Sequence, residues 1–137
     1  MALSHLLDTS VLTRLRDRAV REVVEPLATM GRAARAGISD LEIGYSARNG
    51  AEWDELVAAL DVFVLVETTA EHVQRARQLQ RLLAAEHRRG RKLPDLLIAA
   101  AAEQAGYTVL HYHADFDLIA SVTGQPCQWV VPAGSVD

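Results

Sequence analysis

The sequence has one cysteine, one lysine and no long apolar run. The lone Cys127 excludes an internal disulfide and a cysteine-based metal knuckle, and it fits a reducing cytoplasm, where we expect the protein to act. No stretch approaches the roughly 18 uninterrupted apolar residues of a membrane span, and the first residues lack the basic start and apolar core of a signal peptide. We therefore expect neither a disulfide scaffold nor a membrane partner.

Net positive charge is also missing, because 14 lysine and arginine residues stand against 18 aspartate and glutamate residues, for a net charge of −4. Such a balance argues against nucleic acid as a partner, since polyanions are held mainly by clustered basic side chains. The basic residues are unevenly distributed, however, and Arg88, Arg89, Arg91 and Lys92 lie a few residues before Asp95. This segment is either a solvated helix face or a surface that contacts a phosphate backbone.

What the chain does have is apolar residues, which make up 50% of its 137 positions. That is enough to bury a real core, and we expect a single domain over residues 1–137. Short β-branched and apolar runs alternate with segments of helical periodicity. This alternation predicts a three-layer α/β/α fold around a mostly parallel central sheet.

The boundaries of the expected elements follow from capping and turn residues. Strands are expected over residues 3–7, 62–66, 108–111 and 128–131. Residues 31–37 are expected to form a loop or the approach to a short strand through Ile38. Helices are expected over residues 9–15, 17–30, 39–48, 52–60, 68–89, 94–105 and 115–122. Pro26 is expected to kink or end the second helix, and Gly90 to close the helix that starts near residue 68.

Two of these helix starts have the spacing of a capping box, Ser39 with Glu42 and Thr68 with Glu71. The helix that follows Thr68 should bury the apolar stripe formed by Val73, Ala76, Leu79 and Leu83.

Acidic residues recur where the expected helices begin. They are Asp8, Glu42, Asp95 and Asp115. In a parallel sheet the carboxyl ends of the strands open onto the crevice where ligands bind, so the fold gathers such helix starts along one edge. Carboxylates that lie close together repel one another and need a compensating charge. Hard oxygen ligands of this kind select Mg²⁺ or Mn²⁺ rather than a soft metal.

Each acid also has a structural interpretation, because a carboxylate at a helix N-terminus accepts free backbone N–H groups and suits the helix dipole. Asp8 and Asp115 are candidate N-caps, Glu42 a capping-box partner, and Asp95 a first-turn charge. If all are only caps, the chain is a non-catalytic binding module. A phosphoacceptor or phosphatase site is a further alternative, although such sites normally place a second acid near the nucleophile and a lysine, and Lys92 is the only lysine.

Taken together, the segments around these acids resemble the PIN domain, and specifically the VapC-type toxin ribonucleases of bacterial toxin–antitoxin pairs. The matching segments are Leu6-Leu7-Asp8-Thr9-Ser10, Ser39-Asp40-Leu41-Glu42-Ile43, Leu93-Pro94-Asp95-Leu96-Leu97 and Ala114-Asp115-Phe116-Asp117. They occur in the family's order and approximate spacing, and the resemblance covers nearly the whole chain. It implies a Rossmann-like PIN fold, a Mg²⁺- or Mn²⁺-dependent endoribonuclease acting on RNA, a homodimer, and a cognate antitoxin that covers the acidic cleft.

The resemblance also implies roles for single residues. The acidic quartet that binds metal corresponds to Asp8, Glu42, Asp95 and Asp115, and Ser10 corresponds to a supporting hydroxyl. A bound metal lowers the pKa of a water, which then attacks the phosphodiester in line. The side chains of Arg88, Arg89, Arg91 and Lys92 would orient the RNA.

One position departs from the family pattern. Many relatives carry an aspartate two residues before the Asp-Phe pair, and this chain carries His113 there. The sequence leaves open whether Asp115 alone supplies the fourth carboxylate, whether Asp117 assists, or whether His113 itself ligates the metal.

Overall fold

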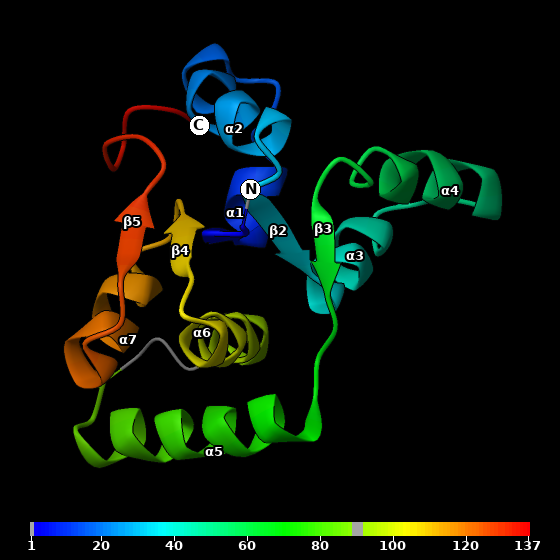
Figure 1. Cartoon of the computed structure of the whole chain (residues 1–137). Coiled ribbons are helices and arrows are strands. Elements are labelled where there is room, and N and C mark those ends of the chain that lie inside the picture. Colours follow the sequence, from blue (N-terminus) through cyan, green and yellow to red (C-terminus); the bar gives the residue numbers. More distant parts are fainter. Residues whose placement is uncertain (1, 89–91) are drawn as a thin grey trace.

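A computed structural model describes residues 2–88 and 92–137 (Figure 1). Its strands form one five-stranded sheet in the order β3-β2-β1-β4-β5, and every pair of neighbours runs parallel. The strands are β1 (His5–Leu7), β2 (Ala33–Ala36), β3 (Val64–Val66), β4 (Thr108–His111) and β5 (Cys127–Trp129). The expectation of a mostly parallel sheet is confirmed.

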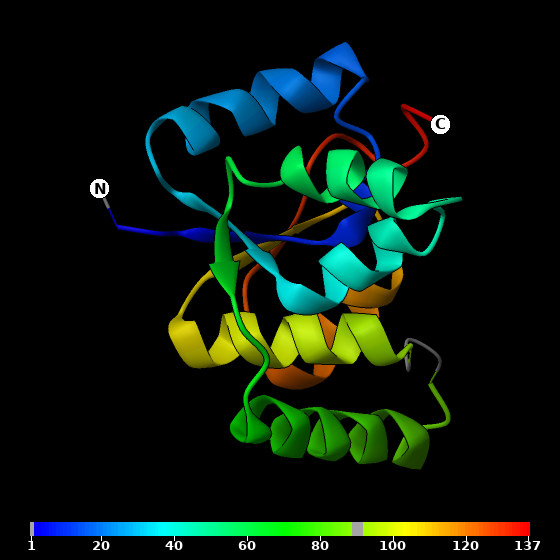
Figure 2. The same ribbon diagram turned by 90° about the vertical axis from the view of Figure 1, so that its right-hand side faces the viewer.

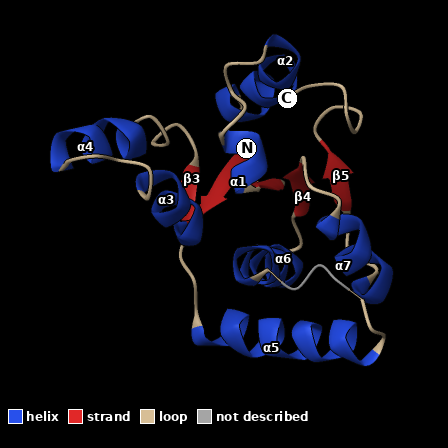
Figure 3. Cartoon of the chain, turned by 180° about the vertical axis from the view of Figure 1, so that it is seen from behind, coloured by secondary structure: helices blue, strands red, loops and turns tan. Residues whose placement is uncertain are grey.

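Helices cover both faces of this sheet (Figure 3). They are α1 (Thr9–Leu12), α2 (Arg18–Thr29), α3 (Gly37–Gly44), α4 (Gly50–Ala58), α5 (Ala70–Ala85), α6 (Leu93–Ala105) and α7 (Asp115–Thr123). The helices α1 and α2 lie on one face, α6 and α7 lie on the other, and α5 packs outside α6 (Figure 1). The three-layer α/β/α arrangement is therefore confirmed. No helix in the described part of the chain is both long and apolar enough to span a bilayer.

Two hydrophobic cores lie above and below the sheet because successive strand residues point to opposite faces. In β1, Leu6 belongs to the core under α6 and α7, whereas Leu7 belongs to the core under α1 and α2, and both are 0% exposed. Burying a leucine side chain completely stabilises a fold by about 1.5–3 kcal/mol. A strand sealed on both faces is thus held rigidly, and Asp8 follows directly at its end.

The alanine-rich helix α6 fits closely under the sheet, as its composition predicts. Its alanines from 99 to 102 are almost completely buried, and Pro94 occupies the first turn. Gly106 ends the helix in the left-handed conformation, with φ of 77°, which favours glycine. The expected boundaries of α6 and of β4 are confirmed within one residue.

Pro26 lies inside α2, so the alternative that it ends this helix is wrong. The helix continues to Thr29, and Pro26 is exposed. A proline removes only one helical hydrogen bond, and on the solvent side water can replace the lost donor. The apolar face of α2, with Val20 and Val24 buried, keeps the helix docked on the sheet.

Both expected capping boxes are also wrong. Helix α3 begins at Gly37, two residues before Ser39, and Ser39 is fully buried with its hydroxyl 2.8 Å from that of Thr9. Helix α5 is capped by Thr69, whose Oγ1 accepts from the backbone N–H of His72, while the ring of His72 accepts from the N–H of Thr69.

The later start of α5 changes which of its residues are buried. His72 joins Ala76, Leu79 and Leu83 in the core, and Val73 is 45% exposed. Three members of the expected stripe are confirmed and Val73 is a correction, because residue 72 lies four positions before 76 and shares its face. The helix ends at Ala85, and Gly90 lies outside the described residues.

Candidate metal centre

The sheet order places the predicted site residues along one edge. Strands β1, β2 and β4 are neighbours and parallel, so their carboxyl ends meet. Asp8 follows β1, Glu42 lies on α3 after β2, and Asp115 begins α7 after β4. Helix α6, which packs against β1 and β4, carries Asp95 in its first turn. Figure 2 shows this end of α6 on the same side of the molecule as α1 and α3.

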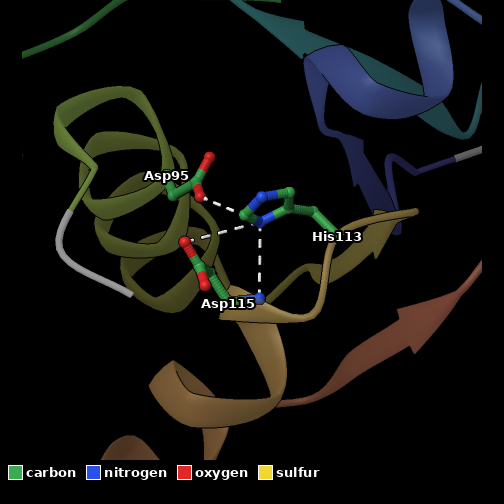
Figure 4. Close-up of side chains that lie close together, drawn as sticks. All are labelled: Asp95, His113 and Asp115. Carbon is green, nitrogen blue, oxygen red and sulfur yellow. Dashed lines mark hydrogen bonds and ion pairs between the residues drawn. The ribbon is translucent and has the colours of Figure 1, made fainter. Parts of the chain in front are cut away.

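Three side chains form the tightest group at this edge, namely Asp95, His113 and Asp115 (Figure 4). One ligand atom from each lies within 4.8 Å of the others. The His113 Nδ1 atom is 3.3 Å from Oδ2 of Asp95 and 3.6 Å from Oδ2 of Asp115. Among the residues described, Asp8 and Glu42 are not members of this tight group.

Asp95 has the most perturbed environment of the acids. Its side chain is buried, and Oδ2 accepts no hydrogen bond from the described part of the protein. Burial, the charges of Asp8 and Asp115 and, to a smaller extent, that of Glu42 raise the pKa of Asp95 to about 7, although Lys92 acts in the opposite direction. The other three predicted acids therefore all raise the pKa of the Asp95 carboxyl group.

Asp8 is both an N-cap and a neighbour of this group. Its Oδ2 accepts hydrogen bonds from the backbone N–H of Ser10, at 3.0 Å, and from the Ser10 hydroxyl, at 2.5 Å. The same hydroxyl oxygen accepts the backbone N–H of Tyr112 at 2.9 Å. The donor directly after β4 therefore directs the Ser10 proton toward Asp8 and fixes the orientation of that carboxylate.

Glu42 is held by a residue that the sequence analysis gave no role. Thr9 donates its hydroxyl proton to Oε1 of Glu42 at 2.6 Å, and its oxygen lies 2.8 Å from the hydroxyl of Ser39. Glu42 is therefore not the capping partner of Ser39. The sequence indicates this role of Thr9 only by its position, because Thr9 directly follows Asp8 at the end of a buried strand.

The remaining acids near β4 have separate environments. Helix α7 begins at Asp115 itself, so this side chain is not its N-cap. The carboxylate of Asp117 accepts the indole N–H of Trp129, with distances of 3.1 and 3.3 Å to its two oxygens. Asp117 thus faces β5, and in the described residues it is not part of the tight group.

The basic segment reaches this edge at Lys92, whose Nζ lies 3.3 Å from Nε2 of His113. Arg88 instead donates to the hydroxyl of Ser121 on α7 at 2.8 Å. Arg89 and Arg91 lie outside the described residues. Contacts of these side chains with RNA stay a prediction.

Two distances in the tight group are close to those between ligands of one divalent cation. Ligand atoms about 2.1 Å from an octahedral ion are about 3.0 Å apart when adjacent. The distances of 3.3 and 3.6 Å from His113 Nδ1 to the two carboxylate oxygens are close to this value. The Oδ2 atom of Asp95 has no hydrogen-bond donor within the described residues, and the neighbouring carboxylates repel one another. A bound cation would neutralise this negative charge.

Comparison with known proteins decides the family. The PIN domain matches residues 5–122 of the chain. The chain is similar to Ribonuclease VapC51 of Mycobacterium tuberculosis, with 65% identity over 137 residues and full coverage of both proteins. The chain belongs to the PIN domain family. Ribonuclease VapC21 of the same species is 42% identical, with 98% of this chain and 99% of that protein covered.

Solved structures share the fold of this PIN domain. The crystal structure of VapBC2 from Rickettsia felis bound to a promoter DNA fragment aligns with a TM-score of 0.76, covering 94% of this chain and 99% of that one at 19% identity. The DNA-bound VapBC of Salmonella typhimurium aligns with a TM-score of 0.72 at 18% identity, covering 94% and 99%. At these identities the likeness concerns the fold alone.

The raised pKa of Asp95 predicts how the stability of the metal-free PIN domain depends on pH. The folded pKa of about 7 lies above the ordinary 3.8, so the folded state binds a proton that the unfolded chain has released. This contribution is fully present below pH 3.8 and is lost as the pH rises through 7. Melting temperatures of the wild type and Asp95→Asn, measured without metal, should therefore diverge from pH 4 to 7, with the variant the more stable.

The comparison of the two proteins cancels the titration of groups that do not interact with Asp95. Burial lowers the pKa of His111, which destabilises both proteins equally at acidic pH and cancels in the difference. A difference in melting temperature that stays constant from pH 4 to 8 would contradict the proposed environment of Asp95.

Proposed function

We propose that this PIN domain is a metal-dependent endoribonuclease and the toxin of a toxin–antitoxin pair, acting in the cytoplasm as one domain over residues 1–137. The observation that carries the proposal is the group of Asp95, His113 and Asp115 at the carboxyl edge of the sheet, with Asp8 and Glu42 close enough to raise the pKa of Asp95. The names of the curated relatives, which are ribonucleases, support RNA as the substrate.

In the proposed site Asp8, Glu42, Asp95 and Asp115 hold Mg²⁺ or Mn²⁺. When bound, the ion supplies an activated water and positive charge next to the departing oxygen of the phosphodiester. The chain itself positions the ligands, because Ser10 orients Asp8 and Thr9 holds Glu42. Lys92, at the rim of this group, is suited to bind an RNA phosphate.

The proposal includes two protein partners. A cognate antitoxin is supported by the solved structures of this fold, which include VapBC toxin–antitoxin complexes. A second copy of the chain, forming a homodimer, rests on the resemblance to VapC-type proteins. Size-exclusion chromatography with light scattering, on the chain alone and with its antitoxin, measures both associations.

Removal and return of the metal test the function. Protein freed of metal by a chelator should leave structured RNA intact, and added Mg²⁺ or Mn²⁺ should produce discrete internal cuts. The same ions should raise the melting temperature, because a ligand that binds only the folded state at ten times its Kd adds about 1.4 kcal/mol. Mapping RNA ends in cells after induction of the chain, beside the Asp8→Asn form, would identify the sites cut.

The competing functions give different results. A non-catalytic binding module would neither cut RNA nor change its melting temperature with Mg²⁺. A phosphoacceptor protein would become labelled by a small phosphoryl donor, and a nuclease would not. Internal cuts that persist in excess chelator at full rate would overturn metal dependence.

A further inference from the structure

The group of Asp95, His113 and Asp115 contains a nitrogen donor among its oxygens. We propose that Nδ1 of His113 is a direct metal ligand, and that it makes the site prefer a first-row transition ion such as Mn²⁺ over Mg²⁺. This inference rests on the proposed function, since it concerns the same ion. It adds the choice of metal, which the carboxylates alone leave open.

The geometry of the ring supports direct ligation. Figure 4 shows the Nδ1 edge of His113 directed at the carboxylates of Asp95 and Asp115, which come from two different helices. Its distances of 3.3 and 3.6 Å to their Oδ2 atoms are within a few tenths of an ångström of the spacing between adjacent ligands of one ion. An ion bound there needs only small movements of the side chains.

Asp95 supplies the second, independent observation. The residue is 8% exposed, and its Oδ2 accepts no hydrogen bond within the described ranges of the chain. A buried carboxylate oxygen without a donor is costly unless a positive charge lies beside it. The atom lies 3.3 Å from His113 Nδ1, and an ion bound by both atoms would supply that charge.

The hydrogen-bond donors around the imidazole must rearrange when an ion binds. The backbone N–H of Asp115 lies 3.3 Å from Nδ1, and Lys92 Nζ lies 3.3 Å from Nε2, so a donor faces each ring nitrogen. A neutral imidazole carries one N–H and offers only one lone pair, so one contact is always mismatched. An ion at Nδ1 takes this lone pair and requires the proton on Nε2, so the N–H of Asp115 gives up its contact and the exposed Lys92 must leave the ring. Binding of the ion thereby frees Lys92 for an RNA phosphate.

The identity of the donor atoms determines the choice of ion. Mg²⁺ is a hard ion that takes oxygen ligands almost exclusively and keeps much of its water. Imidazole is a better ligand for transition ions, whose affinities rise along the first row from Mn²⁺. A site in which one donor is an imidazole therefore loses more affinity for Mg²⁺ than for Mn²⁺.

The test compares the wild type with His113→Asn, which replaces a neutral nitrogen donor by a neutral amide oxygen. Mn²⁺ bound to the wild type should show coupling to a histidine ¹⁴N nucleus in pulsed electron paramagnetic resonance, and the variant should lose this coupling. By isothermal titration, the affinity for Mn²⁺ should fall at least about tenfold, since loss of even an outer-shell partner changes metal affinity that much. The affinity for Mg²⁺ should fall less, so the preference for Mn²⁺ over Mg²⁺ should decrease. His5→Gln, at the opposite end of β1, is the matched control and should keep both properties.

The outcomes separate this proposal from the proposed function. Absence of ¹⁴N coupling in the wild type, or its persistence in His113→Asn, overturns ligation by His113 while RNA cleavage can still proceed. Failure of the wild type to bind either ion or to cut RNA would overturn the proposed function itself. If His113→Asn does not fold, His113→Asp provides the same comparison. It replaces nitrogen by a hard, charged oxygen and should shift the preference toward Mg²⁺, and an unchanged preference would refute the proposal.

Discussion

Replacing Asp95 by asparagine should abolish RNA cleavage and at the same time stabilise the metal-free protein. The activity should fall by at least on the order of a hundredfold, as it does when an enzyme loses one group that stabilises developing charge. Stability should rise because the ionised Asp95, whose pKa is about 7, is buried among other carboxylates at pH 8. With about 1.4 kcal/mol per pKa unit, the gain is on the order of 4 kcal/mol.

Two measurements on the same preparation check this prediction, a gel assay of RNA cuts with saturating Mn²⁺ and a thermal melt in a chelator. Asp54→Asn is the control, because Asp54 is an exposed acid on α4 and its change should affect neither result. Asp8→Asn should also abolish cleavage, with little effect on stability because asparagine still caps α1. Full activity of Asp95→Asn would remove its proposed role, and a loss of stability would show that its carboxylate is not the repelled group described above.

Part of the site could be predicted from the sequence, because its acids serve activity and not stability. Acidic residues stand at the ends of buried strands, and the parallel topology brings those ends together. Carboxylates that meet in this way repel one another and lower the stability of the fold. Asp8 and Asp115 were predictable on this ground, because β1 and β4 are short apolar runs with clear ends. Asp95 was predictable because Pro94 marks the start of a helix that is apolar on nearly all sides.

The features that the sequence did not predict depend on contacts between distant segments. A Ser-x-x-Glu spacing predicts a capping box at Ser39, but packing under Thr9 buries the serine and Glu42 bonds to Thr9 instead. Thr68 and Thr69 are equally good caps locally, and the core decides between them by burying His72. The contact between Lys92 and His113 spans 21 positions and has no local signature at all.

Arg35 is the residue for which a large loss of stability is expected. It lies on β2 and is 6% exposed, and its guanidinium donates to both carboxylate oxygens of Asp40, at 2.8 and 3.2 Å. It also donates to the carbonyl oxygens of Leu60 and Phe63, at 2.9 and 2.6 Å. One side chain thus joins the central sheet to the start of α3 and to the turn before β3.

Arg35→Met keeps most of the volume of the side chain but removes every one of these donors. The Asp40 carboxylate would then lose its cation, and the carbonyl oxygens of Leu60 and Phe63 would each lose a donor, although that of Leu60 keeps the backbone N–H of Phe63. Removing one member of a buried ion pair costs about 3–5 kcal/mol. For a domain of this size the melting temperature should fall by on the order of 10–20 °C. Because Asp40 lies two residues before Glu42 on α3, the folded fraction should also bind Mn²⁺ more weakly.

The matched control for Arg35 is Arg18→Met, which removes an ion pair with Glu22 whose side chains are 86% and 65% exposed. Exposed pairs contribute less than about 1 kcal/mol, so this variant should melt within a few degrees of the wild type. The double variant Arg35→Met with Asp40→Leu should recover part of the loss, because the abandoned carboxylate is removed as well. If Arg35→Met and Arg18→Met have the same melting temperature, the Arg35–Asp40 ion pair does not hold α3 on β2. Glu42 must then be positioned by Thr9 alone.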